Sequence, residues 1–313
     1  MRPIERRRRT RTSNAQLRSV TSDVQPSVAR AQPRLGTIVS VRIGGLPAML
    51  ANSPLEAAFR AISDVQMLMS FHEPSSDVSR LNREAVTRAV PVDARTMYVI
   101  KRAVDFSRSS AGAFDITIAP LLVAQGHLPR PDSPYIPHPH ASFEDIVFLT
   151  GNRIRFKRPL WIDLGGIAKG YAVDHAFERM GVANHAQVCI NAGGDLRVAG
   201  PNYESVLLNV GAPANEAAPV VRLSDGSLAT STGRSAAQRP ARGAGPHFHG
   251  VRKTTVGRRA AATVIATDCL EADALTKIVL ACGQESAPIL RRYRATAFTN
   301  DDRRGWRRIG ADA

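Results

Sequence analysis

The sequence is poor in cysteine and tryptophan and has no long apolar run. Only three cysteines (Cys189, Cys269 and Cys282) and two tryptophans occur in 313 residues. Such a sparse, odd set of cysteines excludes a disulfide-stapled scaffold and is typical of a reducing compartment. No stretch of about 18 apolar residues occurs, so no transmembrane segment is predicted. Because no apolar segment follows the N-terminal arginines, we expect no signal peptide and a cytoplasmic location.

Acidic residues are also outnumbered, with 27 Asp and Glu against 42 Lys and Arg, for a net charge of +15. Much of the excess lies in residues 1–30, which hold eight arginines against two acidic residues, and in residues 291–313, which hold seven against three. The first segment could contact an anionic surface by counterion release. Without interleaved aromatic or glycine residues, however, it predicts a disordered basic leader over 1–33 and no specific nucleic-acid partner.

The body of the chain carries enough apolar residues, 43% overall, for a hydrophobic core. We expect one domain over 34–290, followed by a basic C-terminal strand and tail over 291–313. Helical spacing predicts three helices. The first covers 52–69 with Pro54 in its first turn, the second begins after its N-cap Asp93, and the third covers 169–180. Residues 75–82 read as a loop. A capping box between Asp268 and Glu271 predicts the start of the last large helix.

Alternating apolar residues predict strands over 36–43, 146–149, 153–156, 186–190, 205–210, 219–223, 228–230 and 262–265. Strands and helices mix without a regular βαβ period. The fold class predicted is therefore α+β.

The most informative motif is IDLGGIAKGY at residues 162–171. A glycine turn that leads into a helix presents backbone N–H groups to an anion, and Lys169 adds a positive charge suited to a phosphate. Asp163 could accept a hydrogen bond from a base edge or a sugar. The alternative is a tight strand-to-helix turn whose glycines serve backbone geometry alone.

Three further segments carry polar or glycine patterns. NAGGD at 191–195 permits close approach of a ligand to the backbone, although taken alone it favours a simple hairpin turn. In ADALTK at 272–277, Asp273 and Thr276 share one helix face, which suits Mg²⁺ or ordinary helix capping. In HFHG, His247 and His249 could supply a general base near neutral pH.

Taken in order, seven segments resemble the FAD:protein FMN transferase family, the ApbE-like flavin transferases. The resemblance spans about residues 34–283. It is carried by LGT at 35–37, DVSRLN at 77–82, GAFDITIAPLL at 112–122, IDLGGIAKGYAVD at 162–174, NAGGDLRVAG at 191–200, LATS at 228–231 and ADALTK at 272–277.

The resemblance implies an α+β fold of two intertwined halves with the flavin nucleotide site between them. It further implies that FAD is the substrate and Mg²⁺ the cofactor. A threonine hydroxyl of a flavin-acceptor protein would attack the FMN phosphorus, and AMP would leave. Two alternatives stay open: an FAD pyrophosphatase that releases AMP and FMN, and a catalytically weakened homologue that only binds FAD.

The resemblance also implies roles for individual residues. Residues implied to contact FAD are Leu35, Phe71, Ala113, Phe114, Asp115, Asp163, Lys169 and His249. Residues implied at the metal are Gly166, through its carbonyl, together with Asp273, Thr276 and Lys277. Asp273 and His249 are the implied catalytic residues.

Several positions depart from the family pattern. Many members carry threonine where this chain has Lys277, and an ammonium there could repel Mg²⁺ or replace part of its role. The Asp-Pro after the family histidine is missing from HFHGVRKTTVG at 247–257, and the loop after Pro120 has no tryptophan. These departures predict weakened catalysis.

Overall fold

The structure is a computed structural model that describes residues 26–182, 186–208, 218–233, 245–257, 260–301 and 305–310. Its centre is an eight-stranded sheet in the order β1-β2-β6-β7-β10-β11-β12-β13, in which every neighbouring pair is antiparallel. The strands are β1 Ser27–Arg34, β2 Thr37–Gly44, β6 Gln187–Ala192, β7 Asp195–Ala199, β10 Gly226–Thr232, β11 Ala260–Ala266, β12 Thr296–Asp301 and β13 Gly305–Gly310. Two small sheets complete the strands: β3 Val90–Pro91, β5 Arg153–Phe156 and β4 Ile146–Leu149 in one, β8 Glu204–Leu207 and β9 Val220–Leu223 in the other.

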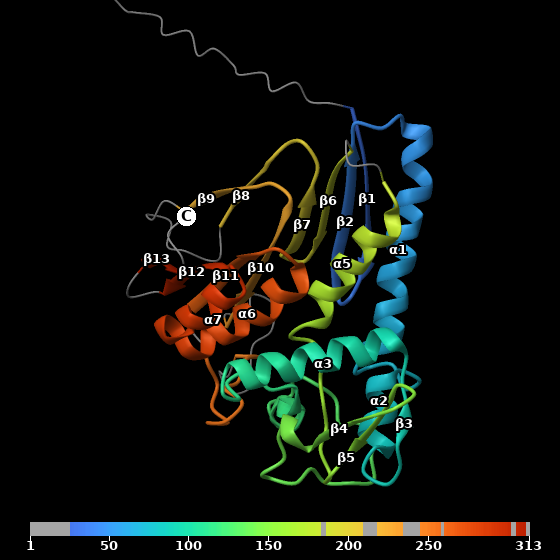
Figure 1. Cartoon of the computed structure of the whole chain (residues 1–313), viewed down its shortest axis with the longest axis vertical. Helices are drawn as coiled ribbons and strands as arrows, with labels where there is room; N and C mark the ends of the chain where they lie inside the picture. Colours follow the sequence, from blue (N-terminus) through green and yellow to red (C-terminus); the bar gives the residue numbers. More distant parts are fainter. Residues whose placement is uncertain are drawn as a thin grey trace, which may run out of the picture.

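Two groups of helices pack against different parts of the large sheet. Figure 1 shows α1 and α5 beside the β1–β2–β6 part, α6 and α7 beside the β10–β13 part, and α3 crossing towards the small sheet β3–β5. The helices are α1 Ala48–Met69, α2 Asp77–Glu84, α3 Ala94–Ser109, α4 Ala119–Ala124, α5 Ala168–Met180, α6 Cys269–Cys282 and α7 Ala287–Arg292. This mixture confirms the α+β class. Within the described ranges, no helix is both long and apolar enough to span a bilayer.

Periodicity explains most of these elements. In α1 the buried residues include Leu55, Phe59 and Ile62, which recur every three or four positions and face the core. In β2, Val39, Val41 and Ile43 alternate with more exposed residues. Gly181 ends α5 in the left-handed conformation, with φ of 58°. These predictions from the sequence are confirmed.

Two boundaries differ from the expected ones. Strand β1 starts at Ser27, within the expected leader of 1–33, and pairs with β2 along its whole length. This edge strand alternates exposed and half-buried residues, so it lacks the apolar signal of an inner strand. Residues 1–25 lie outside the described part. Helix α1 starts at Ala48, so Pro54 lies inside it rather than in its first turn.

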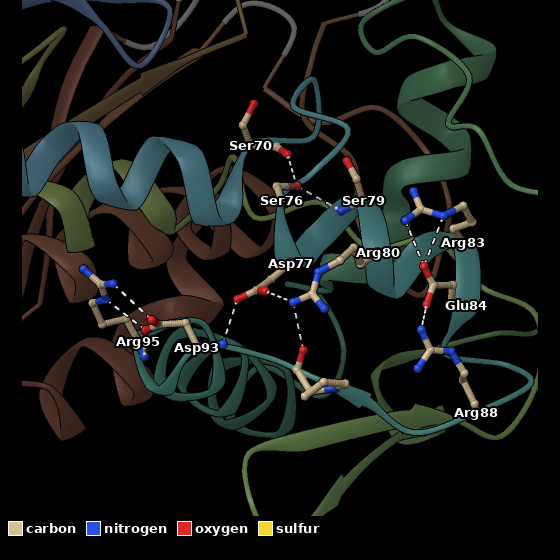
Figure 2. A network of polar contacts seen from close by, with 11 residues as sticks. Ser70, Ser76, Asp77, Ser79, Arg80, Arg83, Glu84, Arg88, Asp93 and Arg95 are labelled. Carbon is tan, nitrogen blue, oxygen red and sulfur yellow. Dashed lines mark hydrogen bonds and ion pairs between the residues drawn. The ribbon is translucent and has the colours of Figure 1, made fainter.

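The expected loop over 75–82 is instead mostly the helix α2. Figure 2 shows why it forms: the Ser76 hydroxyl accepts a hydrogen bond from Ser79 N at 3.0 Å and donates one to Ser70 O at 2.6 Å. Asp77 then pairs with Arg80 and accepts from Asp93 N at 2.9 Å. The short helix buries few apolar residues, so these polar contacts define it more than periodicity does.

The expected capping box of α6 is wrong. Asp268 makes no side-chain cap, and Glu271 pairs with Arg102 of α3 at 2.6 Å. The first N–H groups of α6, those of Cys269 and Leu270, donate to Asp174 of α5 at 3.0 and 2.8 Å. A carboxylate from another helix therefore supplies the cap, which local sequence cannot show. This cap fixes α5 against α6, the two helices that carry the candidate site.

Candidate functional site

Two adjoining cavities lie beside the start of α5. Cavity A has a volume of about 220 Å³ and cavity B about 450 Å³. Both are lined by Leu128, Asp163 and Gly165, so they share one wall. Cavity A is further lined by Phe114, Asp115, Ile116, Ile118, Leu122, His127, Gly166, Pro246, His247, Phe248 and Lys277. Cavity B is further lined by Leu35, Gly36, Val65, Gln66, Met69, Ser70, Phe71, His72, Ala168 and Lys169. A mostly apolar pair of cavities that meet at a few polar groups is typical of a ligand site.

The shared wall is the glycine turn of the IDLGGIAKGY motif. Asn82 of α2 fixes its entry, because Ile162 N donates to Asn82 Oδ1 at 2.7 Å and Asn82 Nδ2 donates to Ile162 O at 3.0 Å. Asp163 Oδ2 then accepts from Gly165 N at 3.1 Å. The turn leads into α5 at Ala168. The expected geometry of a glycine turn before a helix is confirmed, and its helix N-terminus favours an anion.

Four charged side chains of alternating sign lie behind this turn. Lys169 Nζ pairs with Asp195 Oδ2 at 2.5 Å, and Lys277 Nζ pairs with Asp273 Oδ1. Asp273 Oδ2 accepts from Gly170 N at 3.1 Å, which ties α6 to the first turn of α5. Both carboxylates are 0% exposed. Lys277 lines cavity A and Lys169 lines cavity B, so each lysine joins a buried carboxylate to the wall of a cavity.

Asp195 reaches this cluster from a tight hairpin. Gly193 and Gly194 both have positive φ, 65° and 103°, and join β6 to β7. A Cβ at Gly193 would lie 2.5 Å from Thr37 Oγ1, so no larger residue fits there. The NAGGD segment is therefore a hairpin turn, and that turn also places Asp195 beside Lys169.

Burial and charge shift several pKa values in the site. Burial raises the pKa of Asp163 to about 6, and burial together with the nearby Asp273 raises that of Asp195 to about 6. Burial alone would raise the pKa of Asp273, but the ammonium groups of Lys277 and Lys169 outweigh it and hold that pKa below its ordinary value. Burial lowers the pKa of His247 to about 3, so this imidazole is neutral at pH 7.

The raised pKa of Asp163 predicts a pH-dependent stability. The folded carboxyl has a pKa of about 6 against 3.8 for the free side chain, so the folded state holds the proton more tightly. Stability therefore falls as the pH rises from about 4 to about 6 and stays lower above it. Asp163→Asn keeps an oxygen acceptor without the charge. We expect its free energy of unfolding, measured in urea, to exceed that of wild type by about 3 kcal/mol at pH 7.5 and to equal it at pH 4. An equal difference at both pH values would contradict this.

The structure brings together most of the residues implied by the family resemblance. Leu35 and Phe71 line cavity B with Lys169, and Asp163 lines both cavities. Leu35 has a φ of 54°, and its N–H donates to Gln66 Oε1 at 2.8 Å. The β1–β2 turn is thereby fixed to α1 at the cavity edge. Phe114, Gly166 and Lys277 line cavity A.

Other implied residues lie in the wall or behind it. Asp115 borders cavity A, but its Oδ1 accepts from Thr117 N and Oγ1, both at 2.8 Å, and its Oδ2 accepts from Phe143 N at 3.3 Å. Ala113 is buried and accepts from Gly250 N through its carbonyl. Asp273 and Thr276 are 0% exposed and line neither cavity. Asp273 and Thr276 therefore lie behind the cavity walls, whereas Asp115 is part of the wall of cavity A.

The two histidines of HFHG have separate surroundings. His247 lines cavity A together with Asp163 and Lys277, whereas His249 lines neither cavity. His249 is buried, and its Nδ1 accepts from the N–H groups of Val251 and Arg252 at 3.3 and 3.4 Å. The histidine that borders the space is therefore His247, not the expected His249. Because the two histidines are only two positions apart in one short segment, the sequence could not show which of them borders the cavity.

Comparisons with known proteins relate the chain to one family. The model of the ApbE family matches residues 35–298. A Vibrio cholerae protein named FAD:protein FMN transferase is 26% identical over 183 residues, 56% of this chain and 55% of that protein. A Haemophilus influenzae protein of the same name is 27% identical over 156 residues, 46% of this chain and 45% of that protein. The aligned part thus spans about half the length of these curated relatives.

Solved structures show the same fold. The ApbE protein of Thermotoga maritima superposes with a TM-score of 0.77 at 23% identity, covering 91% of this chain and 97% of its own. The flavin transferase ApbE of Vibrio cholerae gives a TM-score of 0.72 at 20% identity, covering 91% and 96%. At these identities the likeness concerns the fold.

Proposed function

The chain belongs to the ApbE family, and on that premise we propose that it transfers FMN from FAD to a hydroxyl group of a target protein. The observation that carries this proposal is the glycine turn at 163–169 between two adjoining cavities. Cavities on both sides of an anion-binding turn suit a dinucleotide whose pyrophosphate lies at the helix N-terminus and whose two ends lie apart.

The proposed reaction is a phosphoryl transfer. The oxygen of a threonine hydroxyl on the acceptor protein bonds to the FMN phosphorus, and the bond from that phosphorus to the bridging oxygen breaks. AMP leaves with the bridging oxygen, and the hydroxyl proton is released. The protein contributes position and charge: Lys169 and the N-terminus of α5 stabilise the negative charge that develops on the phosphates.

The released proton needs an acceptor in the site. The pKa of Asp163, about 6, suits proton transfer at neutral pH, whereas the His247 imidazole, with a pKa of about 3, is a weak base. We therefore propose Asp163 as the proton acceptor and His247 as a contact to the nucleotide. Asp273 would act through Lys277 and the Gly170 N–H, which it positions. A cytoplasmic location stays part of the proposal, supported by three cysteines that are all free.

The expected Mg²⁺ site does not match the residues as arranged. Asp273 Oδ1 is bonded to Lys277, and Thr276 Oγ1 is held by Asp273 O at 2.7 Å and Ser231 Oγ at 2.8 Å. Within the described ranges, no three His, Cys, Asp or Glu side chains form a metal-binding group. No step of the proposed reaction is therefore assigned to a divalent cation.

The proposed function is tested by incubating the full chain with FAD and a threonine-bearing acceptor protein, with Mg²⁺ and separately with EDTA. Flavin fluorescence should stay on the acceptor band of a denaturing gel, and should be lost when the target threonine is replaced by alanine. AMP release at the same rate without any acceptor would identify a pyrophosphatase instead. Bound FAD without AMP would identify a binding protein.

A matched pair of variants tests the histidine assignment. His247→Ala removes a side chain from the wall of cavity A and should weaken FAD binding by about tenfold, the loss of one good contact. His249→Ala should leave the dissociation constant within about threefold, because this side chain lines neither cavity. Quenching of FAD fluorescence measures both. A larger loss in His249→Ala than in His247→Ala would reverse the assignment.

A further inference from the structure

Lys277 lies where the wall of cavity A meets helix α6. Its Nζ pairs with Asp273 Oδ1 and donates to Asp273 O at 3.1 Å. Its Cε lies 3.7 Å from the point where a Cβ would stand on Gly166, so the side chain packs against the glycine turn. The side chain therefore joins the buried carboxylate of Asp273 to the glycine turn.

Every oxygen of Asp273 already has a partner. Oδ1 is taken by Lys277, Oδ2 accepts from Gly170 N at 3.1 Å, and the carbonyl accepts from Thr276 Oγ1 at 2.7 Å as well as from Lys277. A magnesium ion requires oxygen ligands at about 2.0–2.1 Å in near-octahedral geometry. Such an ion could reach Asp273 only by displacing Lys277, against the repulsion between two cations.

Asp273 also depends on Lys277 for its charge. A carboxylate that is 0% exposed is strongly disfavoured without a cationic partner. The other nearby ammonium, that of Lys169, is engaged by Asp195 at 2.5 Å. Displacement of Lys277 would therefore leave a buried charge without its direct partner unless another cation replaced it.

Lys277 keeps a donor for a ligand. An ammonium carries three N–H donors, and the contacts with Oδ1 and the carbonyl oxygen of Asp273 use two of them. One N–H of the ammonium is thus left for a ligand, and Lys277 lines cavity A beside the glycine turn, where an anion is favoured. A single positive charge at this place would offset part of the charge of a pyrophosphate.

We infer that Lys277 is the resident cation of this site and takes the position that a divalent metal ion would otherwise occupy between Asp273 and the phosphates. This inference rests on the proposed function for the identity of the phosphates as those of FAD. It makes FAD binding independent of divalent cations. It also makes the cation a covalent part of the chain, which chelators cannot remove.

The test compares FAD binding by the full chain in EDTA and in millimolar Mg²⁺, measured by fluorescence quenching. For wild type the two dissociation constants should agree within about threefold. Lys277→Thr should bind about tenfold more weakly than wild type in EDTA and recover with Mg²⁺. The FAD dissociation constant of Lys277→Arg, which keeps the charge, should not change with Mg²⁺. Binding by wild type that is at least about tenfold tighter with Mg²⁺ would overturn the inference.

A second readout needs neither FAD nor activity. Binding of Mn²⁺ to the free chain is followed by electron paramagnetic resonance, with thermal unfolding of each variant as a check on folding. Wild type should bind no Mn²⁺ at this site, whereas Lys277→Thr should bind one ion. The double variant, which carries both Lys277→Thr and Asp273→Asn, should bind none there. Mn²⁺ binding by wild type that Asp273→Asn abolishes would overturn the inference. If wild type binds no FAD in either buffer, the proposed function fails, and the Mn²⁺ result alone decides the role of Lys277.

Discussion

Asp273→Ala should lower the rate of FMN transfer by roughly 100-fold and the free energy of unfolding by roughly 3–5 kcal/mol, because truncating one member of a buried, hydrogen-bonded ion pair leaves the other charge without its partner. The alanine would release Lys277 and the Gly170 N–H together. Both effects follow from one contact network. The rate is measured as flavin fluorescence on the acceptor, and the stability by urea unfolding.

The matched control for this variant is Asp105→Ala. Asp105 lies on α3, is half exposed and pairs with Arg108 at 3.2 Å. An exposed pair contributes little, so we expect a change in unfolding free energy of less than about 1 kcal/mol and an unchanged transfer rate. A transfer rate for Asp273→Ala within a few-fold of the control would show that Asp273 does not position the site.

Gly170→Ala should lower the free energy of unfolding by about 3 kcal/mol or more, at the upper end of the cost of overpacking. A Cβ at Gly170 would lie 2.3 Å from Cys269 O and 2.8 Å from Asp273 Cβ. Helix propensity alone predicts the opposite sign, a gain of about 1 kcal/mol for alanine over glycine inside α5. The sign of the effect therefore decides whether the close approach of α5 to α6 is real.

Gly44→Ala is the control for the glycine substitution. A Cβ there would lie no closer than 3.5 Å to any atom, and Gly44 has no positive φ. We expect urea unfolding within about 0.5 kcal/mol of wild type. If Gly170→Ala behaved like Gly44→Ala, α5 and α6 would not be packed as described, and the Asp273–Gly170 contact would fall with them.

Apolar periodicity was sufficient to place the core elements. The spacing of Leu55, Phe59 and Ile62 located α1, and the alternation of Val39 and Val41 located β2, because these residues face a single buried side. Features that depend on polar or long-range contacts were missed. Helix α2 depends on the cap by Ser76. The start of α6 was placed correctly at Asp268, but its cap comes from Asp174, 95 residues away from Cys269.

The motifs located the site, but not how its parts contact one another. The glycine turn before α5 was predicted correctly, since a turn before a helix is a local property. The charge cluster consists of two ion pairs, Lys169–Asp195 and Lys277–Asp273. The first pair joins α5 to β7, whereas the second lies within α6. The sequence signal for Asp195 was its place directly after the glycine pair of a hairpin. Nothing in HFHG indicated that His247 rather than His249 faces the cavity.

The most direct test of FMN transfer is to identify what is attached to the acceptor and what is released. FAD is incubated with the chain and the acceptor, the acceptor is digested, and its flavin peptide is analysed by mass spectrometry while free AMP is quantified. We predict a peptide that carries FMN on a threonine, without adenine, and one AMP for each flavin attached. A peptide that carries whole FAD, or no flavin while AMP accumulates, would contradict the proposed transfer.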